Sequence, residues 1–211
     1  MKIKSLLVSI MLSVLLLTSC KRDNEENPSP ATGTLTPASE VPITAKEGYI
    51  TFTANGTEYS SNNPVIYDYQ TSISHKGNAL FSSYELKDSI ENLTVGYLNR
   101  VAGDTTTFSF SLYANINKKP IVPGHTYLSI QILEVWLGKL GALMGFYNDK
   151  LEGHNYKPID EKGSVFIKHF DKVNGKVTGS FSYMTKGKKG ETMAEDIKVT
   201  GRFNNINFVK E

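Results

Sequence analysis

The chain has 211 residues, of which 23 are basic and 21 acidic. Residues 1–19, which have the pattern of a removable leader, hold two of the basic residues, Lys2 and Lys4, and no acidic residue. Without them the basic count falls from 23 to 21 and equals the acidic count. A balanced chain lacks the basic excess that nucleic acids attract, and we expect no nucleic-acid partner. Its single cysteine, Cys20, excludes a framework of internal disulfides.

Residues 1–19 have the pattern of a secretory signal peptide. Two lysines precede an apolar stretch that begins near Leu6 and is shorter than the roughly 20 residues of a membrane-spanning helix. The stretch ends in Leu17-Thr18-Ser19-Cys20, which resembles the bacterial lipobox. That resemblance implies cleavage before Cys20, lipidation of its thiol and attachment of the chain to a membrane through acyl chains.

Residues 20–47 are predicted to form a flexible tether that begins with the lipidated Cys20. The segment 21–47 contains four prolines and no aromatic residue, so it has too little apolar surface to offset the entropy of ordering. Its acidic start, KRDNEE, resembles the export signal of Bacteroidetes lipoproteins and implies an outer-membrane location facing the cell exterior. The remainder, 48–211, is expected to be a single all-β domain.

Alternation of apolar and polar residues with period 2 predicts half-buried β-strands along this domain. The alternating ranges are 50–54, 107–112, 128–132, 177–183 and 197–203, with weaker strands at 65–73, 79–86 and 92–98. Asn55-Gly56 and Asn174-Gly175 predict two-residue hairpin turns, in which both central residues have φ > 0. About ten strands at this spacing indicate an antiparallel two-sheet sandwich or a flattened barrel.

Three segments carry a resemblance to a known family. They are ITFTANGTEYSS near the start of the domain, and GSVFIKHFDKVNGKVTGSFSYM and IKVTGRFNNINF at its end. Their order resembles a family of Bacteroidetes outer-membrane lipoproteins with an all-β domain, lipocalin-like or sandwich. The resemblance covers the opening hairpin and residues 141–208, and it implies fold and location. It brings no catalytic residues.

The segment 148–162, NDKLEGHNYKPIDEK, is the most polar part of the domain and is predicted to be a long loop. Long loops in compact domains tend to be functional. We therefore expect a ligand to contact this loop, through Asp149, Glu152, His154 and Tyr156.

Motifs for catalysis or metal binding are not recognisable in the sequence. The four histidines, at positions 75, 125, 154 and 169, have none of the spacings typical of metal ligands. No G-x-S-x-G elbow is present, and lipidation would occupy the thiol of Cys20. We therefore expect a protein without enzymatic activity, metal or cofactor.

Two tripeptides resemble the O-glycosylation sequon of Bacteroidetes, an Asp followed by Ser or Thr and then an apolar residue or Thr. They are Asp88-Ser89-Ile90 and Asp104-Thr105-Thr106. Both are expected in turns between strands, where the hydroxyl groups of Ser89 and Thr105 would be accessible to a transferase.

These observations together predict a surface lipoprotein that acts as a non-catalytic binding module for a glycan or a protein partner. A lipocalin-like carrier of a small apolar ligand is the alternative, and a hydrolase is a third, less favoured one. A cavity inside a closed barrel would favour the carrier, whereas a filled sandwich would favour binding at the surface.

Overall fold

Strands make up most of the part of the chain that the computed structural model describes. That part comprises residues 35–44, 46–66, 75–101, 104–131, 134–135, 138–150, 156–189, 192–193 and 195–211, which all belong to one compact unit. In chain order its elements are η1(Ala38–Glu40), β1(Tyr49–Ala54), β2(Thr57–Ser61), β3(Gly77–Lys87), β4(Ile90–Val101), β5(Asp104–Asn115), β6(His125–Leu128), β7(Gly141–Asn148), β8(Tyr156–Asp171), β9(Lys176–Lys189), β10(Thr192–Met193), β11(Ile197–Asn207) and β12(Val209–Lys210).

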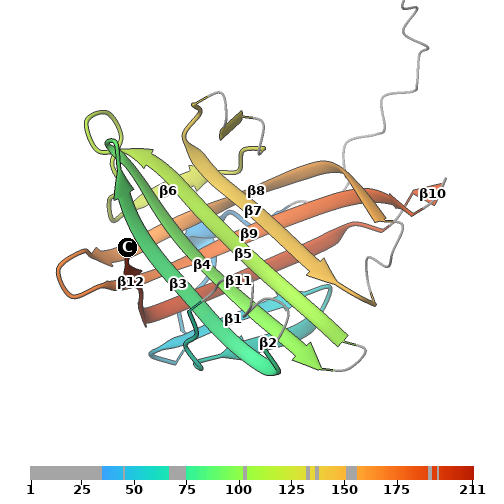
Figure 1. The fold of residues 1–211 in the computed structure, drawn as a ribbon. Helices are drawn as coiled ribbons and strands as arrows, with labels where there is room; N and C mark the ends of the chain where they lie inside the picture. Colours follow the sequence, from blue (N-terminus) through green and yellow to red (C-terminus); the bar gives the residue numbers. More distant parts are fainter. Residues whose placement is uncertain are drawn as a thin grey trace, which may run out of the picture. The chain divides into compact units, whose positions relative to one another are not determined.

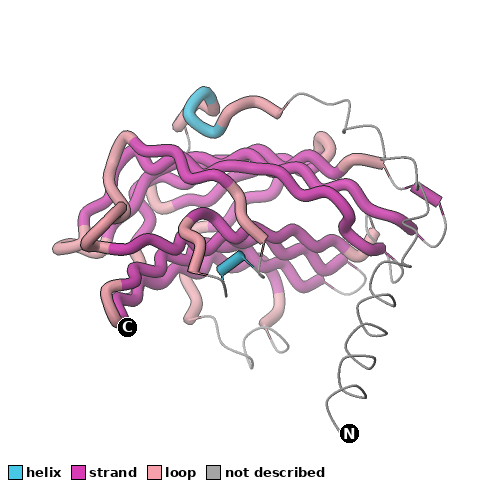
Figure 2. Tube along the Cα trace, turned by 90° about the horizontal axis from the view of Figure 1, so that it is seen from above, coloured by secondary structure: helices cyan, strands magenta, loops and turns pink. Residues whose placement is uncertain are grey.

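The strands form two sheets that pack face to face, which confirms the predicted all-β sandwich (Figure 1). One sheet has the order β2-β1-β11-β9-β8-β6, with β10 paired to β9, and the other has the order β12-β3-β4-β5-β7. All strand pairs are antiparallel except β12 with β3. The two layers are visible from above in Figure 2.

The edges of the two sheets approach each other without forming a continuous ladder. Isolated parallel bridges join Pro64 to Leu80 and Ser129 to Ala142. Because neither bridge is part of a longer ladder, the architecture is a sandwich rather than a closed barrel. The second bridge lies where β6 ends and β7 begins, which is also where the candidate site is found.

Aromatic rings fill the space between the sheets. Phe108 and Phe181 stack with ring centroids 4.3 Å apart, and Phe52 contacts both at 5.4 and 6.2 Å. On β11 the core-facing position beneath these rings is Gly201, where a Cβ would lie 2.4 Å from Phe181 Cζ and 2.4 Å from Phe52 Cβ. Glycine is therefore required at position 201, because the rings occupy the volume of a side chain.

The predicted strands at 50–54, 79–86, 92–98, 107–112, 177–183 and 197–203 are confirmed. The strand predicted at 128–132 is wrong: the strand β6 ends at Leu128, and Ser129 forms only the single bridge to Ala142. Leu128 is 70 % exposed, so its alternation with neighbours does not mark a buried face. Of the weaker strand at 65–73, residues 65 and 66 are not in a strand and 67–73 lie outside the described residues.

One of the two predicted hairpin turns has the expected geometry. Asn55 and Gly56 both have positive φ, at 46° and 85°, as a type I′ turn requires. Between β8 and β9, only Gly175 has positive φ, and the turn spans 172–175. There the Asp171 carboxylate accepts the backbone N–H of Val173 and Asn174, both at 2.9 Å, so side-chain bonding favours the longer turn.

The predicted tether extends too far toward the C-terminus, because residues 35–44 include a segment packed on the sandwich. Ala38 in η1 is completely buried against the face of β8 and β9 that points away from the core. Its backbone N–H donates to Ser164 Oγ at 3.4 Å, and its carbonyl accepts the hydroxyl of Ser180 at 2.5 Å. The boundary predicted at residue 48 is therefore too late. Cys20 and residues 1–34 lie outside the described residues.

Candidate functional site

A cleft of about 680 Å³ opens at the edge where β6 and β7 meet. Its walls come from the end of β5, the segment 118–122, the strand β6 with residues 129–130, and the start of β7 with residues 139–140. One end is closed by the inter-sheet link, in which the N–H of Ile130 donates to the carbonyl of Ala142 at 2.9 Å. The cleft thus lies where the strand ladders of the two sheets stop.

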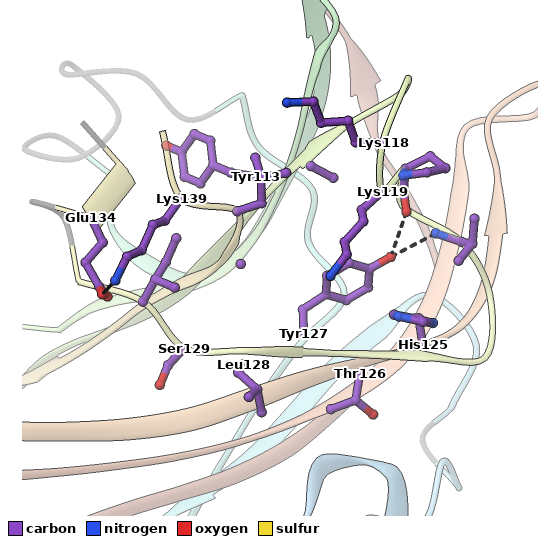
Figure 3. Close-up of a pocket in the computed structure, with 16 residues that line it drawn as sticks. Tyr113, Lys118, Lys119, His125, Thr126, Tyr127, Leu128, Ser129, Glu134 and Lys139 are labelled. Carbon is purple, nitrogen blue, oxygen red and sulfur yellow. Dashed lines mark hydrogen bonds and ion pairs between the residues drawn. The ribbon is translucent and has the colours of Figure 1, made fainter. Parts of the chain in front are cut away.

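Tyr127 forms a fixed aromatic wall of this cleft. Its hydroxyl accepts the N–H of Val122 at 2.9 Å and donates to the carbonyl of Pro120 at 3.1 Å (Figure 3). Burial, the largest cause, raises the pKa of this phenol, and the charge of Glu91 acts in the same direction. Tyr127 therefore stays neutral, and its ring rather than its hydroxyl is what a ligand can contact. The His125 ring lies 5.6 Å from it.

Lys118 and Lys119 supply positive charge at the rim. The carbonyl of Asn115 accepts the N–H of both lysines, at 3.1 and 2.8 Å, so a tight turn holds their backbone in place. Figure 3 shows the Lys118 side chain extending toward the side on which Tyr113 lies, and the Lys119 side chain running toward the ring of Tyr127. Neither lysine forms an ion pair with another described residue.

Glu134 and Lys139 form an ion pair at the opposite end of the cleft. The carboxylate also accepts the N–H of Gln131 at 2.9 Å. The hydrogen bond from Lys139 lowers the pKa of Glu134, with a smaller contribution from the N–H of Gln131. Because Glu134 is the only carboxylate among the described lining residues, its pairing leaves the charge of Lys118 and Lys119 uncompensated within the cleft.

A buried carboxylate inside the sandwich holds the segment next to these lysines. Glu91 is completely buried and accepts the N–H of Ile121 at 2.7 Å and the hydroxyl of Tyr84 at 2.8 Å. It also pairs with the Lys172 ammonium, which lies over the Tyr84 ring at 5.9 Å from the centroid. The rim of the cleft is thereby fastened to the core through charge-assisted hydrogen bonds.

A smaller pocket of about 350 Å³ shares Ser129, Ile130 and Glu134 with the cleft. Its remaining lining includes Glu161, whose carboxylate accepts the hydroxyl of Tyr183 at 2.7 Å. The two pockets differ in charge, because Glu161 adds a second carboxylate to the smaller one.

Of the four predicted ligand contacts, only the side chain of Asp149 is described, and it has a structural partner. Its carboxylate accepts the N–H of Thr105 at 3.0 Å, and its own N–H donates to the carbonyl of Thr105 at 3.1 Å. Glu152 and His154 lie outside the described residues, and Tyr156 begins β8 opposite Lys189. None of the four is in the described lining of the cleft.

The long loop predicted at 148–162 is wrong, because residues 156–162 belong to β8 and pair with β9. Polar composition suggested a loop, but the segment is a strand that contains a proline, Pro158. The ladder shifts register between Pro158 and Asp160, and such an irregularity tolerates a residue that lacks an N–H.

The two candidate glycosylation sites lie in different surroundings. Ser89 lies in the β3–β4 turn and has φ of 68°, so its expected position in a turn is confirmed. Thr105 instead lies within β5, opposite Arg100. The β4–β5 hairpin is tight, because Val101 and Asp104 pair with each other. Thr105 therefore lies in the strand ladder, and its predicted position in a turn is wrong. Modification of either residue stays a prediction.

Cleft residues such as Lys119, His125 and Tyr127 were missed by the sequence analysis. The available signal was the run NKKPIVPGHTY, in which lysines, prolines and an aromatic residue stand close together. Within the described ranges, no three His, Cys, Asp or Glu side chains gather as a metal site would require. No helix in the same ranges is long and apolar enough to cross a membrane.

Comparisons with protein-family models, curated proteins and solved structures give no match for this chain.

Proposed function

We propose that this protein is an outer-membrane lipoprotein whose β-sandwich binds a small molecule in the cleft at the β6–β7 edge, without catalysing a reaction. The cleft is the observation that carries the proposal. Its volume of about 680 Å³ falls within the range of roughly 300–1,000 Å³ typical of small-molecule sites. Its lining combines aromatic and apolar walls with polar side chains that can orient a ligand, which also fits that class of site.

The filled interior argues against a carrier that encloses its ligand. Phe108 and Phe181 are completely buried and in stacking contact, so aromatic side chains occupy the position that a ligand has in a lipocalin. Binding at the edge of the sandwich needs no rearrangement of this core.

The polar groups of the cleft favour binding over chemistry. The hydroxyl of Tyr127 is used by two backbone partners, and the Glu134 carboxylate is paired with Lys139. A general acid or base needs a proton-transfer group that faces its substrate. These two groups are instead bonded to other groups of the protein.

The ligand site can be tested with N-phenyl-1-naphthylamine, an apolar dye that fluoresces when it enters an apolar site. The test protein is the chain from Lys21 onward, which contains the complete sandwich. We expect micromolar binding that is lost in Ile130→Trp, because an indole added to the lining fills the cleft. The matched control is Val173→Trp, whose side chain is 83 % exposed and outside the lining. Absence of binding, or equal binding by both variants, would refute the proposed site.

The proposed location depends on Cys20, whose surroundings resemble a lipobox. We expect a palmitate analogue to label the full chain in a bacterial host that lipidates exported proteins, and Cys20→Ser to abolish the labelling. Label that persists in the variant would contradict lipid attachment at this residue.

A further inference from the structure

The charge of the cleft indicates what kind of molecule it binds. Lys118 and Lys119 line it on a turn fixed by Asn115. The one described lining carboxylate, Glu134, is neutralised by Lys139. An uncharged ligand would leave the two lysines without a counter-charge, whereas an anionic ligand would supply one.

One part of the lining is suited to an apolar body. Tyr113, Ala114, Val122, Ile130 and Leu140 contribute to the walls. Tyr127 adds a ring whose hydroxyl is already hydrogen-bonded at 2.9 and 3.1 Å. Apart from the hydroxyl of Tyr113, these side chains offer a ligand no hydrogen-bonding group, so this part of the lining suits a hydrocarbon chain better than a row of hydroxyl groups.

We propose that the cleft binds a small amphipathic monoanion, with its carboxylate at Lys118 and Lys119 and its hydrocarbon part against Tyr127 and Ile130. This inference rests on the proposed binding function and specifies its ligand class. The attraction acts at an exposed rim, so it contributes through two partly screened ion pairs, while burial of the hydrocarbon part supplies most of the affinity.

The test compares decanoate with decan-1-ol, which share a chain length and differ in charge at pH 7.5. Calorimetric titration of the chain from Lys21 onward should give a Kd for decanoate at least tenfold lower than that for decan-1-ol, which equals about 1.4 kcal/mol. Raising the salt concentration should weaken decanoate binding and leave the alcohol unaffected.

Charge reversal assigns the effect to the rim. In Lys118→Glu/Lys119→Glu we expect the Kd for decanoate to rise at least tenfold and that for decan-1-ol to change less than twofold. The control Lys87→Glu/Lys198→Glu carries the same change of net charge at two exposed lysines outside the lining. It should bind decanoate like the wild type.

The possible results separate the ligand class from the binding function. Equal affinity for acid and alcohol, both lost in Ile130→Trp, would overturn the anionic ligand and leave the binding site standing. Binding of neither compound would overturn the amphipathic monoanion, and absence of dye binding as well would overturn the binding function. Preference for decanoate that is reduced equally by both pairs of substitutions would assign the effect to net charge and refute the role of Lys118 and Lys119.

Discussion

The interior of the sandwich and the cleft at its β6–β7 edge are both lined by aromatic side chains, yet only the cleft leaves space for a ligand. In the interior, two facing sheets bring rings such as Phe108 and Phe181 into contact at 4.3 Å. At the edge, the sheets are linked around the Ser129–Ala142 bridge, and Tyr127, with His125 as its neighbouring ring, lines a cleft. The end of the strand ladder, rather than the amount of apolar surface, distinguishes the cleft from the filled interior.

Truncation of a central ring should lower stability without changing ligand affinity, and so distinguish the interior from the cleft most clearly. Phe181→Ala is expected to lower the free energy of unfolding by about 3–5 kcal/mol, because it leaves a cavity among packed rings. The folded fraction should bind the naphthylamine dye at the cleft with unchanged affinity. Urea denaturation and dye titration measure the two quantities. A stability loss below about 1 kcal/mol would mean that the interior is loosely packed.

A second test concerns the packing of the segment around η1 on the outer face of β8 and β9. Ala38→Arg should displace this segment, because the side chain has no room above Ser164 and Ser180, at a cost of about 1–3 kcal/mol. Limited proteolysis should then cut near residue 38. Ser39 is exposed, so Ser39→Arg is the matched control and should remain resistant. Equal cleavage of wild type and both variants would contradict the packing of this segment.

Tyr84 connects the interior to the rim of the cleft through Glu91, and it should make stability sensitive to alkaline pH. Burial, followed by the hydrogen bond to Glu91, raises the pKa of Tyr84 above its ordinary value of 10.0. A raised pKa means that the folded state retains the proton longer than the unfolded state. The stabilisation is therefore complete below pH 10 and is lost as the pH rises further, by up to about 1.4 kcal/mol per pH unit.

Tyr84→Phe should remove this part of the pH dependence. Denaturation measured between pH 8 and 11.5 should show a shallower decline for the variant than for the wild type above pH 10. Parallel curves for the two proteins would contradict the role of this phenol.

The smallest expected effect concerns Asp149, which lies outside the described lining of the cleft. Asp149→Ala should cost about 1 kcal/mol, because the N–H of Thr105 loses its acceptor. Asp149→Asn, which keeps an acceptor oxygen, should cost less. Both variants should bind decanoate like the wild type. Loss of binding in either variant would indicate that the ligand binds at the segment that follows β7, as the sequence analysis predicted.

Alternation along the sequence predicted the strands well where one face of the strand is buried. It predicted structure poorly where a strand is short or contains a proline, or where a segment packs by a local close fit. The ranges 107–112 and 177–183 alternate cleanly because every second residue faces the aromatic core. The strand β6 has only four residues, too few for a clear period. The pairing of 156–162 is disguised by Pro158, and the packing of Ala38 depends on a close fit over two serines that no periodic pattern reveals.

The cleft was not predictable from local sequence for a related reason. It forms because β6 and β7, which follow each other closely along the chain, belong to different sheets. Which edge strands meet is a property of the whole topology. Asp149, singled out for its polar surroundings, instead bonds to Thr105 from the neighbouring hairpin, a long-range contact that composition does not show.

Mapping of amide chemical shifts during titration with decanoate tests the proposed binding site most directly. The ¹H–¹⁵N spectrum of the chain from Lys21 onward should show saturable shifts for residues in 118–130 and 139–141. Core amides such as those of Phe181 and Val199 should not move. Shifts concentrated on the core strands β9 and β11, with none at 118–130, would contradict binding at the edge and indicate a ligand between the sheets.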